Sequence, residues 1–180
     1  DSFLLNLSGF TLHKAETQAA LRNSITTWAE GYYSRLRTPL NGEIATLAYP
    51  KSFLFLGSEL SEAFRQRETR EHAIATFMSS GEPEYRAFVT NVVFRNLDKK
   101  PYDADIYFDR VYYSQPLTIT GKKSYFVPIH FSANPSDEEI DRLRKRANLD
   151  IDTVMHANPL VLAITQIGDE RDFSTSPSAN

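Results

Sequence analysis

Apolar residues recur at steps of three or four near the start of the chain. They are Leu21, Ile25, Trp28, Tyr32 and Leu36. This spacing places all of them on one face of a helix, so we expect a long N-terminal helix whose apolar face is buried. The segment from Arg37 to Gly42 contains a proline and an Asn-Gly pair, which end that helix.

A second long helix is expected from Glu59 to Met78, because its apolar and charged positions separate onto two faces. From Glu84 onward the hydrophobic period changes to two, which is typical of strands. We predict strands at residues 85–96 and 102–113, and a last strand at residues 160–167.

A third strand is expected to begin near Leu117, to break at a turn over residues 120–123, and to resume at residues 125–131. Pro128 within it predicts an edge position or a bulge, since proline cannot donate a hydrogen bond to a sheet. Before the last strand, residues 136–147 open with a Ser-x-x-Glu capping box and predict a charged helix.

Helices followed by strands indicate an α+β domain. We expect about four antiparallel strands that curve around the long N-terminal helix. The closest familiar shape is the cone-like sheet of the nuclear transport factor two-like or cystatin-like folds, an analogy that does not fix function. The predicted organisation is a lead at residues 1–12, one domain at residues 13–167 and a flexible polar tail at residues 168–180.

The composition is that of an ordinary globular domain. The chain has 180 residues, 41% apolar residues and a formal charge of -3, so charge indicates no nucleic-acid partner. The absence of cysteine excludes a disulfide framework, thiolate catalysis and a cysteine zinc site. No apolar run approaches the roughly 18 residues of a membrane-spanning helix. Because the chain begins at Asp1 rather than at methionine, we expect a truncation point with a segment removed upstream.

Metal and cofactor chemistry finds little support in the sequence. The histidines are His13, His72, His130 and His156. No two of them have the spacing of helical metal ligands, and none has the glutamate arrangement of a metalloprotease. We therefore predict no metal and no cofactor.

Candidate catalytic residues are also few. The second strand carries three alternating aspartates, Asp103, Asp105 and Asp109. Their period of two predicts a solvent-facing strand face rather than a calcium loop. His130 could act as a general base beside one of them inside a cone-shaped pocket, and the plainer interpretation is a structural or edge-exposed histidine. Residues 121–124 end like a phosphate-binding loop but lack its earlier glycine, which favours a hairpin turn.

Large aromatic residues gather on the first helix and the second strand. They are Trp28, Tyr32, Tyr33, Tyr107, Tyr112 and Tyr113. Most are expected in the core, but rings that keep a polar tip satisfied are also frequent at protein interfaces. We predict that Trp28, Tyr32 and Tyr33 contribute to an interaction surface.

Two motif-like stretches and the order of the elements resemble one protein family. The stretches are Phe88-Val89-Thr90-Asn91-Val92-Val93 and Asn158-Pro159-Leu160 before the last strand. From Ala15 to Ile167 the chain is similar to the periplasmic domain of the inner-membrane assembly subunit of bacterial type IV secretion systems, the eighth VirB-type component and its conjugation relatives. That family reads Asn-Pro-x-Gly at the turn. Here Val161 takes the glycine position, and valine disfavours the positive φ that glycine permits.

The resemblance implies a nuclear transport factor two-like domain in the periplasm, carried by a bacterial inner-membrane protein whose membrane anchor lies upstream of Asp1. Its implied role is non-catalytic: weak dimerisation, binding of other secretion-system subunits, and no direct nucleic-acid binding. We predict that the rigid turn shapes the surface for these contacts, because a preformed loop loses little conformational entropy on binding. The turn residues are Asn158, Pro159, Leu160 and Val161. Two alternatives stay open: an isomerase or dehydratase that uses His130 and a carboxylate, and a small-molecule-binding module.

Overall fold

A computed structural model of the chain describes residues 11–37, 49, 51–115, 118–133, 158 and 161–173. The predictions for the charged helix at residues 136–147, and for Leu117, Pro159 and Leu160, lie outside these residues. Within the described ranges, no helix is long and apolar enough to cross a membrane.

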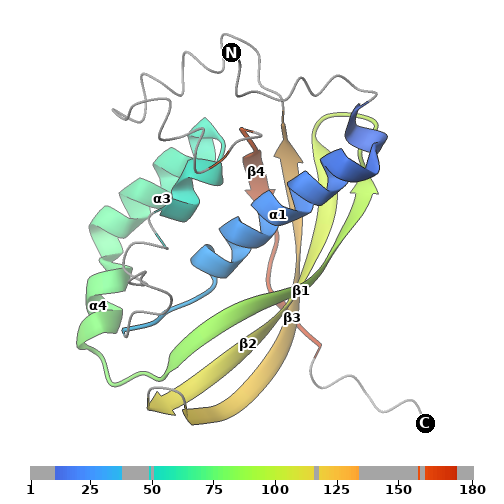
Figure 1. Cartoon of the computed structure of the whole chain (residues 1–180). Coiled ribbons are helices and arrows are strands. Elements are labelled where there is room, and N and C mark those ends of the chain that lie inside the picture. The colour runs from blue at the N-terminus through green and yellow to red at the C-terminus, as the bar shows by residue number, and fades with distance from the viewer. Residues whose placement is uncertain are drawn as a thin grey trace.

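Five antiparallel strands form one sheet in this part of the chain. The strands are β1 (Glu84–Asn96), β2 (Tyr102–Gln115), β3 (Thr118–Ser132), β4 (Ala163–Ile167) and β5 (Arg171–Asp172). Their order is β1-β2-β3-β4, and β5 also pairs with β3. The first three strands are long and strongly curved, and α1 (Ala15–Tyr32) lies across their concave side (Figure 1). The predicted α+β domain with a curved antiparallel sheet is therefore confirmed.

The helix α1 buries the predicted face. Leu21, Ile25 and Trp28 are each 0% exposed and belong to the hydrophobic core. Every second residue of β2 from Tyr102 to Phe108 joins the same core, while the residues between them face the other side of the sheet. The helical periodicity of α1 and the strand periodicity of β2 thus predict residues that belong to the same hydrophobic core.

Both predicted long helices are shorter than expected. After α1 the chain pairs with β1, where Arg35 bridges to Tyr85, so Leu36 lies beyond the helix and is partly exposed. The expected helix at residues 59–78 is two helices, α3 (Ser58–Glu71) and α4 (Ala73–Ser79). His72 separates them with a φ of 49°. A left-handed residue cannot continue a right-handed helix.

The strand β3 is continuous, so the prediction of a turn at residues 120–123 is wrong. Gly121 pairs with Tyr112, and Lys123 pairs with Arg110, inside the ladder with β2. A register shift between Tyr112 and Tyr113 takes up the irregularity beside the glycine. The phosphate-loop interpretation has no structural basis either, because that motif needs a loop before a helix.

Pro128 lies where the second edge of β3 changes partner. On that edge β4 pairs as far as Ile129, and β5 pairs as far as Phe126. Gly168 lies at the gap between them and donates its N–H to the carbonyl of Pro128 at 2.8 Å. A Cβ on Gly168 would lie 2.5 Å from Cγ of Pro128. Pro128 thus lies at a gap in the pairing of an interior strand, and neither the edge strand nor the bulge that was predicted is found there. The close approach requires glycine at residue 168.

The C-terminal part of the sheet differs from its predicted bounds. The strand β4 begins at Ala163 rather than at residue 160, because Val161 and Leu162 belong to the preceding turn. Residues 168–173 belong to the predicted polar tail, but in the structure they contain β5 and pair with β3. Phe173 donates its N–H to the carbonyl of Ser124 at 3.0 Å.

Candidate functional site

Asn158 organises the turn that precedes β4, and the residue is 1% exposed. Its Nδ2 donates to the carbonyl of Leu162 at 2.8 Å and to that of Leu54 at 3.3 Å. Its Oδ1 accepts the N–H of Leu162 at 2.9 Å, and its own carbonyl accepts the N–H of Val161 at 2.9 Å. One side-chain amide thus bonds the backbone of Leu162, after the turn, and of Leu54, in a distant segment. These bonds also satisfy the polar atoms of the buried amide itself.

Val161 has a left-handed backbone, with a φ of 46°. A β-branched residue in this region is an outlier, because its Cβ crowds the neighbouring backbone. The residue is 4% exposed, so the surrounding structure holds it in place. Valine therefore takes a conformation that glycine would adopt without strain, at the position where the resembled family has glycine.

The turn residues make their described contacts inside the chain. Asn158 and Val161 are buried, and Pro159 and Leu160 lie outside the described residues. Their contact with another protein stays a prediction. The buried pair can shape such a surface from within, whereas direct contact would have to come from neighbouring residues.

The aromatic residues of α1 form part of a stacked core. The ring centroids of Trp28 and Tyr32 lie 5.5 Å apart, and the ring of Tyr33 lies 4.8 Å from that of Phe108 on β2. Trp28 is 0% exposed and Tyr33 is 4% exposed, while Tyr32 is half-buried. Burial raises the pKa of Tyr33 above its ordinary value. A structural role for these rings is therefore visible, and their part in an interface stays a prediction.

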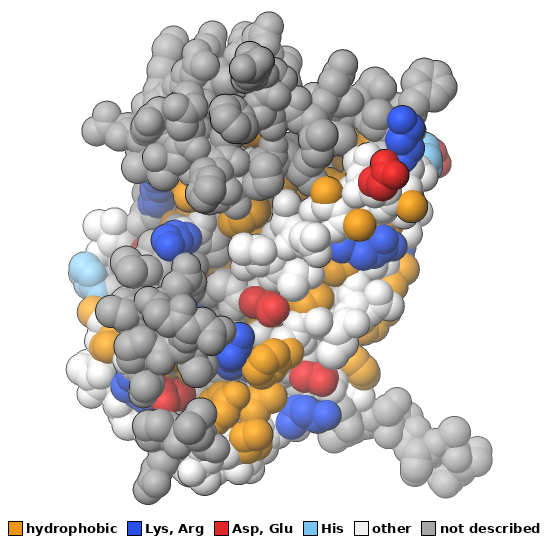
Figure 2. Space-filling model, in the orientation of Figure 1, with side chains coloured by type: hydrophobic (Ala, Val, Ile, Leu, Met, Phe, Trp, Pro, Cys, Tyr) orange, Lys and Arg blue, Asp and Glu red, His pale blue; other side chains and the backbone are white. Residues whose placement is uncertain are grey.

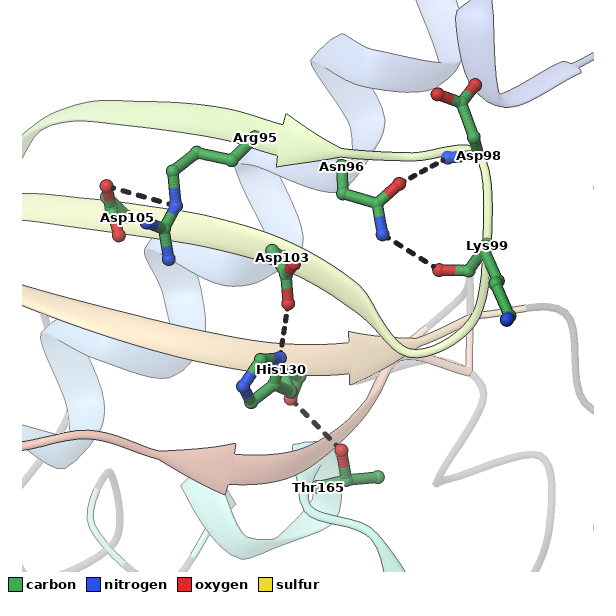
Figure 3. Close-up of polar contacts among 8 residues, drawn as sticks. All are labelled: Arg95, Asn96, Asp98, Lys99, Asp103, Asp105, His130 and Thr165. Atoms are coloured by element: carbon green, nitrogen blue, oxygen red, sulfur yellow. Dashed lines mark hydrogen bonds and ion pairs between the residues drawn. The ribbon is translucent and has the colours of Figure 1, made fainter.

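Polar side chains line the convex face of the sheet, opposite α1 (Figure 3). His130 alternates with buried residues of β3, and its Nδ1 is hydrogen-bonded to Oδ1 of Asp103 on β2. Two residues further along β2, Oδ2 of Asp105 lies 3.4 Å from Nε of Arg95 on β1. Asp103, Asp105 and Asp109 all lie on this face, as their period of two predicted. The aspartate row is thus a strand face with ion-pair partners.

The pair of His130 and Asp103 is the arrangement in which a carboxylate orients an imidazole for acid–base chemistry. Its position is unsuited to the predicted pocket. The two side chains are 40% and 27% exposed, and they point away from the concave side. The hypothesis that His130 lies inside the cone is therefore wrong, because the strand alternation turns Ile129 and Phe131 inward instead.

A hollow of about 860 Å³ lies elsewhere, between α3, α4 and the short helix Phe53–Phe55. Its lining residues are Phe53, Arg65, Glu68, Thr69, His72, Ile74, Ala75 and Met78. Neither His130 nor the aspartates of β2 contribute to it. In the ranges that the structure describes, no cluster of three histidine or acidic side chains could hold a metal ion.

Arg110 lies among aromatic rings on the concave face, a position that was not predicted from the sequence. The guanidinium carbon of Arg110 lies 4.8 Å from the ring centroid of Tyr85 and 4.9 Å from that of Tyr125. Its Nη2 lies 3.3 Å from Oε2 of Glu170. Burial alone would lower the pKa of Arg110, but Glu170 and the hydroxyl of Tyr112 raise it above its ordinary value. Burial, with a hydrogen bond to Tyr112, raises the pKa of Tyr125 to about 12.

Solved structures with a similar fold exist, whereas the two sequence comparisons found no match. No protein-family model matches the sequence, and a comparison with curated proteins found no relative. The soluble domain of TrwG, from the type IV secretion machinery of Bartonella grahamii, matches with a TM-score of 0.58 at 12% identity. The match covers 89% of this chain and 95% of that one.

TraE gives similar matches in two complexes. The complex with 4-(1H-pyrrol-1-yl)pyridine-2-carboxylic acid has a TM-score of 0.57 at 14% identity. The complex with 2-(2-furyl)isonicotinic acid has a TM-score of 0.55 at 12% identity. Both cover 86% of this chain and 96% of TraE. The resemblance drawn from the sequence is therefore confirmed at the level of the fold: the chain folds like the soluble domain of TrwG and like TraE.

Proposed function

We propose that this protein is a non-catalytic assembly subunit of a type IV secretion or conjugation machine. The observation that supports this most strongly is the likeness to the soluble domain of TrwG over 89% of the chain. The buried side chain of Asn158 supports it as well, because its hydrogen bonds to Leu162 hold the backbone before β4 in place. The convex-face pair of His130 and Asp103 lies outside any described pocket, which agrees with a non-catalytic role.

In this proposal the domain works in the periplasm, as part of an inner-membrane protein. It forms a weak homodimer, binds other subunits of the channel and needs no cofactor. Its curved sheet around α1 would be of the nuclear transport factor two-like kind. The turn at residues 158–161 contributes by fixing the shape of the surface, since a rigid loop loses little conformational entropy on binding.

Two association measurements test the proposal. Sedimentation velocity over a range of protein concentrations should show a reversible monomer–dimer equilibrium. Co-purification with each secretion subunit encoded near its gene should identify at least one specific partner. A protein that stays monomeric at every concentration and binds none of these subunits would contradict the proposal.

The turn needs variants that spare its internal hydrogen bonds. Asn158 is unsuitable because its side chain holds the fold. Pro159→Ala and Leu160→Ala are the better choices. Weaker association at an unchanged melting temperature is expected. A lower melting temperature with intact association would limit the turn to a structural role.

One observation favours a second candidate, an isomerase or dehydratase: the hydrogen bond between His130 and Asp103. Turnover of any candidate substrate that disappears in His130→Ala would support it. A small-molecule-binding module is the third candidate. The acids bound to TraE, pyridinecarboxylic acids by name, are suitable first probes for it.

A further inference from the structure

Arg110 extends from β2 into a cage of aromatic rings on the concave side of the sheet. Its guanidinium carbon lies 4.8 to 6.0 Å from the ring centroids of Tyr85, Tyr125, Phe108 and Tyr33. Figure 2 shows hydrophobic side chains gathered on this side of the molecule beyond the end of α1, with charged side chains at their margin. Tyrosine and arginine are the residue types that most often dominate binding energy at protein interfaces.

The carboxylate that neutralises Arg110 is poorly matched to it. Both oxygens of Glu170 lie near the same nitrogen, Nη2, at 3.3 and 3.4 Å. A well-aligned carboxylate makes two parallel bonds to two guanidinium nitrogens. The Nε of Arg110 is buried and has no hydrogen-bond partner in the described part of the chain. The present pairing therefore leaves part of the donor capacity of Arg110 unused.

The two partners also differ in how firmly they are held. The side chain of Arg110 is 13% exposed, whereas that of Glu170 is 37% exposed. Glu170 belongs to the segment Asp169–Asp172, whose residues are all exposed. The surrounding rings hold the guanidinium of Arg110 in place, and a largely buried cation needs an anion beside it. Because Glu170 is the more exposed partner, it is the member of the pair that another carboxylate can replace.

We propose that Arg110 is the docking site for an acidic side chain of a partner subunit, and that Glu170 occupies this site in the free protein. The partner carboxylate takes the place of Glu170 beside the guanidinium. Tyr85 and Tyr125 supply ring faces against which the neighbouring apolar atoms of the partner pack. The identity of the partner as a secretion subunit rests on the proposed function, but the carboxylate site does not.

Sodium benzoate is a suitable probe because it carries one carboxylate and one flat ring. Its binding is measured by NMR titration of the 15N-labelled protein, with sodium chloride at equal ionic strength as the reference. The Kd is taken from the backbone amide signals of Tyr85 and Tyr125, which every variant retains, and the Nε–Hε signal of Arg110 locates the site in the variants that keep this arginine. Neutral benzamide controls for stacking alone. Glu170→Gln removes the charge that competes with benzoate and keeps the size of the side chain, and Asp169→Asn is the matched control that removes one neighbouring exposed charge.

The expected result is that Glu170→Gln lowers the Kd for benzoate about three- to fivefold, as for release of a partly exposed ion pair. Asp169→Asn should leave the Kd unchanged, and Arg110→Lys in the Glu170→Gln background should weaken binding again. Equal Kd values for Glu170→Gln and Asp169→Asn would overturn the proposal, even if Arg110→Lys failed to fold.

A further outcome separates partner from self. If Glu170→Gln dimerises more strongly than the wild type, and benzoate dissolves that dimer, the acidic side chain belongs to a second copy and the assignment to a partner subunit fails. A negative benzoate result would leave the proposed function standing, because the association measurements above do not depend on Arg110.

Discussion

Val161 offers a direct test of backbone strain in the turn before β4. With a φ of 46°, it holds a conformation that costs a residue with a Cβ about 1–2 kcal/mol relative to glycine. Replacement by glycine removes this strain, but it also removes a buried isopropyl group. The informative comparison is therefore between Val161→Gly and Val161→Ala, because both variants lose most of that group.

The difference between these two variants follows from three terms. Glycine escapes the left-handed penalty of about 1–2 kcal/mol. It also makes the unfolded chain more flexible than alanine does, which offsets about 0.4–1 kcal/mol of that gain, and it loses one more buried methyl group, which offsets about 0.8 kcal/mol. The last two terms also apply to glycine and alanine in a regular strand, so the comparison with such a strand isolates the strain. Relative to alanine, glycine should be more favourable at residue 161 than in the strand by about 1–2 kcal/mol. For a chain of this size, each kcal/mol of that difference corresponds to about 2–4 °C in melting temperature.

The assay is thermal or urea unfolding followed by circular dichroism. Val127 in β3 is the matched control, since it is 0% exposed and lies in a regular strand. There, glycine should be less stable than alanine by about 0.5–1 kcal/mol. If glycine is as much less stable than alanine at residue 161 as it is at residue 127, the turn is not strained and the reasoning is refuted.

Three further predictions concern single residues. Gly168→Ala should lower the stability markedly, because its Cβ would lie 2.5 Å from Cγ of Pro128; an unchanged melting temperature would show that the segment moves freely. Asn158→Ala should cost about 2–3 kcal/mol in urea unfolding, since it leaves both backbone groups of Leu162 without their buried partner; a cost near zero would mean that water replaces the amide. Tyr125 should ionise near pH 12, as followed by ultraviolet absorbance, whereas it titrates near 10 when unfolded. Because the folded pKa is the higher one, this residue's contribution to stability should be present below about pH 10 and be lost as the pH rises to about 12.

Local periodicity predicted burial well. The helical spacing of Leu21, Ile25 and Trp28 and the alternation along β2 both correspond to core positions. The same alternation, continued two residues past Phe108, would have placed Arg110 on the inner face. No local pattern could reveal its partner Glu170, which is 60 residues away in the sequence.

The errors have a common physical origin, which is that local signals compete with tertiary pairing. The glycine at residue 121 suggested a turn, yet pairing with β2 keeps it in a strand. His72 carries no sequence signal for the left-handed backbone that divides α3 from α4. Strand alternation was sufficient to place His130 on the face of the sheet opposite Ile129 and Phe131. The expectation of a pocket around His130 came from the fold analogy and not from the residues.

The central proposal, that the protein is a non-catalytic subunit of a secretion machine, is tested most directly in the organism that encodes it. Deletion of the gene should abolish transfer of the DNA or protein cargo by that machine, and the wild-type gene should restore it. A gene carrying His130→Ala should restore transfer equally well, because the account gives this residue no catalytic role. Normal transfer after the deletion, or a folded His130→Ala protein that fails to restore it, would contradict the account.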